Sequence, residues 1–270
     1  MQRGAMTHGR YARLMAGAEA IEIKATIPPK QVAGALAHYK LTASNDEQRF
    51  IYFFDTPKLE LLAAGIIARA RRVVGDDHDS TIKFRPVNPE KVGKRWRKFR
   101  DFKIEADASE KGIVKSASLT MPVAKGLIKR VVAGDKGIAS LFTEEQEAFL
   151  AEMSGGRTPE FATLAVLGPL EAQRWDFEDP ACPWPITGEL WRRADGATLM
   201  EVSVKAPAVQ GAAVMAGFLA FLAEVGAERD NDQQAKTHWA VDHYAARLRK
   251  KAAPRAVAKP ARKRARRKTT

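Results

Sequence analysis

The chain has 270 residues, 45% of them hydrophobic, a composition typical of a globular protein with a sizeable core. A run of about 18 apolar residues is absent, so a transmembrane helix is not expected. The single cysteine, Cys182, excludes an internal disulfide and a cysteine-rich metal site. Together these features predict a cytoplasmic protein without a membrane partner.

The positive charge of the chain, formally +13, is concentrated at its C-terminus. Of the 45 basic residues, 12 lie in 247–270, where no acidic residue occurs, which leaves 33 basic against 32 acidic residues in 1–246. We therefore expect a poorly ordered leader (1–18), a nearly neutral domain (19–249) and a disordered basic tail (250–270). Such a tail either keeps the chain in solution or contacts nucleic acid or polyphosphate without sequence preference.

The predicted elements alternate between strands and helices along the chain. Residues of alternating polarity predict about eight strands, at 19–27, 49–55, 66–73, 79–86, 95–107, 161–178, 184–193 and 197–205. Apolar residues at helical spacing predict helices at 28–41, within 121–153, at 208–226 and at 233–249. Turn sequences, "GDDHD" and "RADG", indicate hairpins. Without a repeating strand–helix–strand unit, this order indicates an α+β fold with an antiparallel sheet.

Several of these strands carry charges on one face and apolar residues on the other. The pattern is present in "AIEIKA", "IARARR", "STIKFRP", "FKIEADA" and "MEVSVKAP". A charged face of this kind lies either in water on an open sheet or inside a closed barrel whose apolar outer surface is covered by helices. Arg69 and Arg71, two like charges on one face, favour the barrel, because an anion between them would offset their repulsion.

The same strands resemble, in chain order, the motifs of the CYTH family, the triphosphate tunnel metalloenzymes. "AIEIK" is similar to the family's opening Glu-x-Glu-x-Lys, and "YFFDTPKLELLAAGIIARARR" to its Tyr-Phe-Asp-Thr-Pro segment followed by Leu-Arg-x-Arg. "TIK", "KIEAD", "LGPLEAQRWDFE" and "GELWRRADGATLMEVSVKAP" resemble the later strands and the closing hairpin. The resemblance covers roughly 19–245 and implies an antiparallel, roughly eight-stranded β-barrel, or tunnel, with a charged interior and helices packed outside.

The resemblance also implies the site residues. A triphosphate-containing small molecule would be bound by Lys24, Arg69, Arg71, Lys83, Lys103, Arg174 and Lys205. Mg²⁺ or Mn²⁺ would be bound by Glu22, Glu105, Asp107, Glu189 and Glu201. Glu22 and Lys24 would take part in catalysis. At two positions the chain departs from the family, because Ala20 and Ser203 stand where the motifs have glutamate.

Three functions are compatible with these motifs. The leading hypothesis is a metal-dependent hydrolase of inorganic triphosphate or of an organic or nucleoside triphosphate. The second is an adenylate cyclase of the class IV type, which would release pyrophosphate from ATP. The third is a non-catalytic triphosphate- or polyphosphate-binding protein tethered to nucleic acid by its tail; Ala20 and Ser203 favour it, since each removes a carboxylate.

Overall fold

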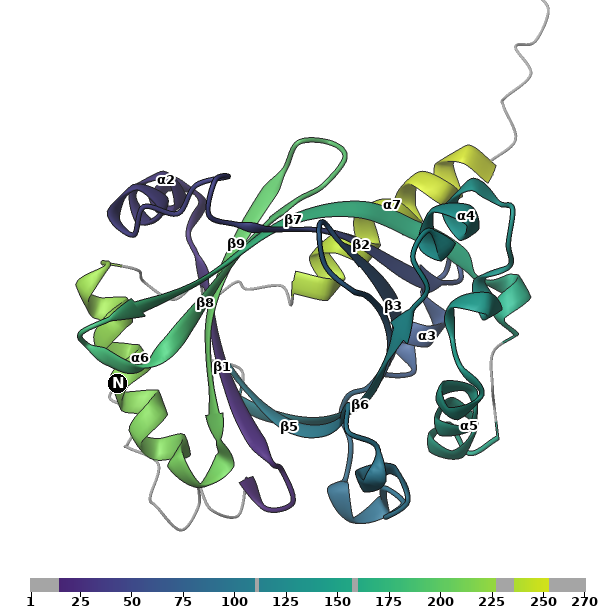
Figure 1. The fold of residues 1–270 in the computed structure, drawn as a ribbon, viewed down its shortest axis with the longest axis horizontal. Coiled ribbons are helices and arrows are strands. Elements are labelled where there is room, and N and C mark those ends of the chain that lie inside the picture. Colours follow the sequence, from purple (N-terminus) through teal and green to yellow (C-terminus); the bar gives the residue numbers. More distant parts are fainter. Residues whose placement is uncertain (1–14, 110–111, 157–159, 227–235, 253–270) are drawn as a thin grey trace, which may run out of the picture.

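A closed β-barrel forms the centre of the protein in the computed structural model, which describes residues 15–109, 112–156, 160–226 and 236–252. In these parts of the chain, nine strands close the barrel in the order β1-β5-β6-β4-β3-β2-β7-β8-β9 (Figure 1). The strands are β1 (Ala20–Ile27), β2 (Glu47–Asp55), β3 (Ile66–Val73), β4 (His78–Phe84), β5 (Phe102–Ser109), β6 (Gly112–Val123), β7 (Ala165–Asp179), β8 (Cys182–Arg192) and β9 (Thr198–Pro207). The predicted α+β barrel is thus confirmed, with one strand more than the sequence suggested.

The additional strand is β6, which pairs with β4 on one side and β5 on the other. Its sequence, "GIVKSASLTMPV", has serine and alanine at its centre, at Ser116, Ala117 and Ser118. These residues have little intrinsic preference for strands, so the pattern was too weak to predict one.

One pair of neighbours, β1 and β5, is parallel, whereas the sequence predicted an antiparallel barrel throughout. The predicted strand at 95–107 begins in the structure only at Phe102. Before it, Trp96 lies in a short 3₁₀ helix and is 2% exposed, with its ring 5.1 Å from that of Phe149. This packed connection returns the chain to the other end of the barrel, so that β5 runs in the same direction as β1.

The helices are α2 (Pro29–His38), α3 (Glu60–Ala63), α4 (Leu127–Ala133), α5 (Glu144–Met153), α6 (Gly211–Glu224) and α7 (Lys236–Ala252). Helices α2 and α6 cover β1, β8 and β9, while α4 and α5 cover β3, β4 and β6 (Figure 1). The apolar residues of the strands point outward, and Ile21 and Ile23 of β1, Ile82 of β4 and Ile104 of β5 are all fully buried. The charged residues that alternate with them must therefore point into the barrel.

Helix α7 is an exception to the prediction that the helices pack outside. Its Val241 and Tyr244 belong to one apolar cluster with Ile51 and Phe53 of β2. Phe53 lies opposite Arg69 in the β2–β3 register, on the charged face of the sheet. Helix α7 consequently packs against the inner surface of the barrel, and its first turn lies within the ring of strands in Figure 1.

The two predicted ends of the chain lie largely outside the described residues. Residues 15–18 of the predicted leader are part of the fold, with Met15 buried in the cluster beneath α6. Helix α7 continues to Ala252, slightly beyond the predicted end of the domain. None of the described helices is long and apolar enough to cross a membrane.

Gln146 fixes α5 to the outer surface of the barrel and is completely buried. Its amide nitrogen donates to the carbonyl oxygens of Ser80 (3.0 Å) and Leu119 (3.1 Å), and its amide oxygen accepts from the Ser80 hydroxyl (2.9 Å). It also completes a capping box with Thr143 at the start of α5. One side chain thus connects a helix to two strands.

Replacing Gln146 by alanine should destabilise the protein by about 3 kcal/mol, because several buried hydrogen-bonding groups lose their partner together. Urea denaturation would measure the change in the free energy of unfolding. The matched control is Glu147→Ala on the exposed side of the same helix, which should cost less than about 1 kcal/mol. Equal losses in the two variants would contradict this role of Gln146.

Candidate anion-binding site inside the barrel

The predicted site residues share the inner face of the barrel. In β1, Glu22 and Lys24 alternate with fully buried, outward-facing isoleucines. Glu22 lies directly opposite Asp107 of β5 and Lys205 of β9 in the strand register, so these three side chains share the inner face. The same alternation turns the remaining predicted residues inward: Arg69, Arg71, Lys83, Lys103, Glu105, Arg174, Glu189 and Glu201.

Solvent reaches the inner face, even though its charges are largely enclosed. The side chains of Glu22 and Lys24 are 22% and 26% exposed, and that of Lys83 is 19% exposed. In a solid apolar core, the exposed fraction of each side chain would be close to zero. Inward-facing charges therefore retain access to a small polar molecule. Lys103 and Lys205 are more exposed than the rest.

Asp107 is the most enclosed carboxylate of the group, and three cations surround it. Its oxygens lie 3.6 Å from Lys24 Nζ, 3.4 Å from Lys83 Nζ and 3.7 Å from Arg85 Nε, and it accepts a hydrogen bond from Ser116. Burial would raise the pKa of Asp107, but these cations outweigh it and hold the pKa well below its usual range. Asp107 is therefore the counter-ion of a cationic group drawn from β1 and from the end of β4.

Lys24 lies between two carboxylates, with Nζ 2.9 Å from Glu22 and 3.6 Å from Asp107. Burial alone would lower the pKa of Lys24, yet the attraction of Glu22, Asp107 and Glu201 raises it well above the ordinary value. Lys24 is consequently protonated at neutral pH. In this state it can donate hydrogen bonds to an anion and stabilise developing negative charge, but it cannot accept a proton.

Arg69 differs from its neighbours because it has no ion pair within 4 Å among the described residues. Its Nε is buried and lacks a hydrogen-bond acceptor. Burial, together with the neighbouring Arg71, lowers the pKa of Arg69 to about 10, so the guanidinium is still charged at neutral pH. A buried, charged donor without an acceptor is costly, so this position is suited to an anion.

The other two predicted arginines already have partners. Arg71 contacts Asp79, with Nη2 2.8 Å from the carboxylate and Nε 3.0 Å from both oxygens. Arg174 contacts Asp176 at 2.6 Å. Only part of either guanidinium is used, because arginine has five N–H donors. Each can still turn donors toward the interior.

Glu189 and Glu201 lie directly opposite each other on β8 and β9, with Lys236 of α7 against both. Lys236 Nζ is 2.7 Å from Glu201 and in direct contact with Glu189. Arg49 of β2 reaches Glu189 at 3.4 Å. Although burial opposes ionisation, Lys236 and Arg49 lower the pKa of Glu189 to about 2.

The sequence prediction missed Lys236 and Arg49. Arg49 could have been found, because it shares one face of β2 with Glu47, two residues before it, in the same period-two pattern of charges as the other strands. Lys236 could not have been found in this way, since it comes from a helix that was expected to pack outside the barrel.

The five carboxylates predicted to bind Mg²⁺ or Mn²⁺ have the right oxygen chemistry, but they do not assemble into a metal site. Each is already paired with a lysine or arginine: Glu22 with Lys24, Glu105 with Lys205, Asp107 with three cations, and Glu189 and Glu201 with Lys236. Within the described residues, no group of three or more acidic, histidine or cysteine side chains is placed to hold a metal ion. As arranged, this donor set does not fit a divalent ion.

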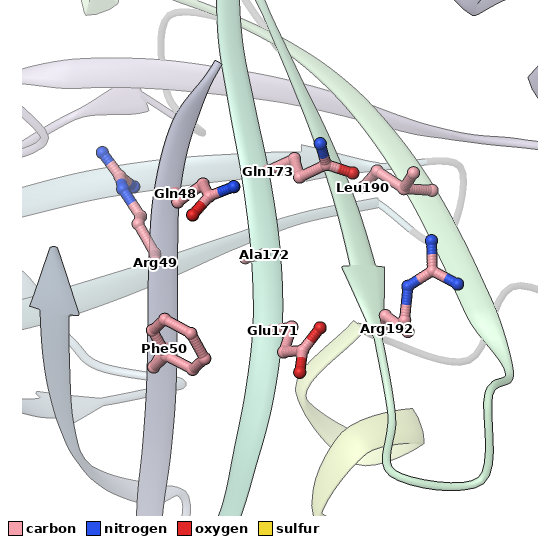
Figure 2. A pocket seen from close by; sticks show the side chains of 8 residues that line it. All are labelled: Gln48, Arg49, Phe50, Glu171, Ala172, Gln173, Leu190 and Arg192. Atoms are coloured by element: carbon pink, nitrogen blue, oxygen red, sulfur yellow. The ribbon is translucent and has the colours of Figure 1, made fainter. Parts of the chain in front are cut away.

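A pocket of about 290 Å³ lies on the wall formed by β2, β7 and β8 and shares Arg49 with this cluster, but none of the predicted site residues. Figure 2 shows Gln48 and Phe50 on the pocket side of β2, with Arg49 pointing away from them. Glu171 lies opposite Arg192 across β7 and β8. The lining of the pocket holds charges of both signs and none of the predicted phosphate ligands. The barrel interior is therefore the better candidate site.

Comparison with known proteins supports the fold. No family model matches the sequence, and no curated protein matches it. A candidate adenylate cyclase from Bacillus halodurans has a similar solved structure, with a TM-score of 0.57 at 12% sequence identity, covering 82% of this chain and 97% of the other. A candidate adenylyl cyclase from Hippeastrum, described as having a dominant triphosphatase activity, gives 0.57 at 14% identity, covering 81% and 93%.

The chain has the fold of these two proteins. At such low identity the likeness concerns the fold alone. Membership of the CYTH family therefore stays a prediction from the sequence motifs, in agreement with the fold.

Proposed function

We propose that this protein binds a triphosphate inside its barrel and hydrolyses it to orthophosphate and a shorter phosphate. The proposal is carried by Arg69, a guanidinium whose buried Nε has no acceptor, on an inner face that it shares with Lys24, Lys83 and Arg71. Guanidinium groups bind phosphate oxygens in a bidentate manner, and lysines add point charges. The names of the two similar structures, a candidate cyclase and a candidate cyclase with triphosphatase activity, agree with such a substrate.

The chain's own residues would act mainly by position and charge, which is what phosphoryl transfer requires. Arg69 and Arg71 would hold the phosphate chain from β3, and Lys83 from β4. The protonated Lys24 would stabilise charge on the leaving phosphate. Because the carboxylates are already paired with lysines and arginines, Mg²⁺ or Mn²⁺ would act through the phosphate chain, whose charge it would neutralise, rather than through a site on the protein.

The first test is phosphate release from inorganic triphosphate, ATP and thiamine triphosphate, with and without Mg²⁺ or Mn²⁺. We expect orthophosphate from at least one of them, and a loss of roughly 100-fold in Glu22→Ala, because Glu22 holds Lys24 in place. The control is Glu147→Ala on α5, which should retain full activity.

The same assay separates the alternatives. Formation of cyclic AMP and pyrophosphate from ATP would contradict the hydrolase proposal and favour a cyclase, the activity for which the two similar structures are named. Tight binding of triphosphate without turnover would favour the non-catalytic alternative. That outcome would agree with Ala20 and Ser203, and with carboxylates that are all engaged by cations.

The basic tail suggests a second contact. We propose that 250–270 binds nucleic acid or polyphosphate through its charge. Deleting 253–270 should abolish a salt-sensitive affinity for DNA and leave triphosphate release unchanged. Equal DNA affinity in the truncated chain would contradict the proposal.

A further inference from the structure

The pairing of Glu189 with Glu201 requires a cation. The two glutamates are directly opposite on adjacent antiparallel strands, and both point into the barrel. Like charges in this position repel each other, and both side chains are largely enclosed, at 18% and 10% exposure. Something positive must therefore lie between them.

Lys236 supplies that charge from a different element. It is the first residue of α7, and its ammonium contacts both carboxylates while lying 4.4 Å from the centre of the Trp191 ring. Its side chain is 12% exposed. The ammonium is thus enclosed by two carboxylates and an aromatic face, an arrangement suited to a cation.

The packing of α7 holds this lysine in place. Helix α7 is attached to the inner wall through Val241 and Tyr244, and the Tyr244 hydroxyl donates to the carbonyl oxygen of Pro169. Close to Lys236, the Arg193 guanidinium lies over the Trp239 ring and donates to the Trp239 carbonyl at 3.2 Å. Lys236 is consequently a tethered cation, whose local concentration at the two carboxylates exceeds that of any free ion.

From these contacts we propose that Lys236 is the resident cation of the Glu189–Glu201 pair and excludes a divalent metal ion from it. A metal ion bound by both carboxylates would have to lie between them, where the ammonium now lies: Mg²⁺ binds oxygen at about 2.0–2.1 Å, and Lys236 Nζ is 2.7 Å from Glu201. Arg49, which is shared with Glu47, adds a second positive charge beside Glu189. A metal ion can therefore bind this pair only when the start of α7 is displaced or Lys236 is removed.

The inference concerns the site of the proposed function, but its test requires no triphosphate and no turnover. Mn²⁺ binding to the full-length protein would be titrated by electron paramagnetic resonance in wild type, Lys236→Met, Lys236→Arg and the double variant Lys236→Met/Glu201→Gln. We expect Lys236→Met to bind one Mn²⁺ more than wild type, and the double variant to lose it. Lys236→Arg, which retains the charge, should behave as wild type.

Thermal denaturation gives a second reading. Lys236→Met should melt at a lower temperature than wild type without metal and recover when Mn²⁺ is added, whereas wild type should respond less. If Lys236→Met does not fold, the single variant Glu201→Gln replaces it in the test. The number of Mn²⁺ ions bound by Glu201→Gln should equal that of wild type, which would support the proposal. A loss of bound Mn²⁺ in Glu201→Gln, or no additional Mn²⁺ in Lys236→Met, would overturn it. Neither result would bear on the triphosphatase proposal, which the phosphate-release assay tests separately.

Discussion

Replacing Arg69 by leucine should weaken the binding of inorganic triphosphate by roughly 100-fold, because two or more charge-assisted hydrogen bonds are lost at once. The same substitution should raise the melting temperature of the free protein. It removes a guanidinium whose buried Nε has no acceptor and which lies beside Arg71. Opposite signs for binding and stability distinguish a ligand-binding residue from a structural one.

Isothermal titration calorimetry and thermal denaturation would measure these two effects, each with and without Mg²⁺. The matched control is Arg72→Leu, on the same strand but on its outer face, where the guanidinium lies 3.9 Å above the Phe50 ring. That variant should lose less than about 1 kcal/mol of stability and none of its triphosphate affinity. If Arg69→Leu binds triphosphate as wild type does, the anion site lies elsewhere.

Replacing Asp107 by asparagine should destabilise the free protein by about 3 kcal/mol or more, since the change removes the counter-ion of Lys24, Lys83 and Arg85 without changing the shape of the side chain. Because folding lowers the pKa of Asp107, its contribution is fully present at neutral pH and is lost only as the pH falls through the lowered, folded-state pKa. The difference from wild type should therefore persist at every pH above about 5.

An anion should rescue the Asp107→Asn variant. Triphosphate or phosphate would replace the missing negative charge, so each should raise the melting temperature of the variant more than that of wild type. Asp135→Asn, an exposed substitution at the end of α4, is the control and should show neither the loss nor the rescue. A variant as stable as wild type in the absence of anions would show that the three cations need no internal counter-ion.

Sequence alone was sufficient to divide the residues between the two faces of the barrel. Alternation along a strand is a local property, and the outward isoleucines of β1, β4 and β5 are all fully buried. For that reason the period-two pattern by itself assigns Glu22, Arg69, Lys83 and the other predicted residues to one face. The turns at 75–79 and 193–196 were equally local, and each joins two strands in the structure.

Tertiary structure decided which of these charges meet. No period in the sequence specifies that Asp107 collects cations from β1 and β4, or that the Nε of Arg69 has no acceptor. The parallel pairing of β1 with β5 likewise joins segments that are far apart in the chain, with Ala20 opposite Glu105, so no local pattern specifies it.

The position of α7 shows the difference most clearly. The sequence predicts this helix from its apolar spacing, but the surface it covers depends on which apolar wall remains uncovered once the barrel has closed. Ile51 and Phe53 supply that wall inside, and Lys236 is carried with the helix to Glu189 and Glu201. Local patterns determined what each residue faces, whereas the closure of the barrel determined what each residue touches.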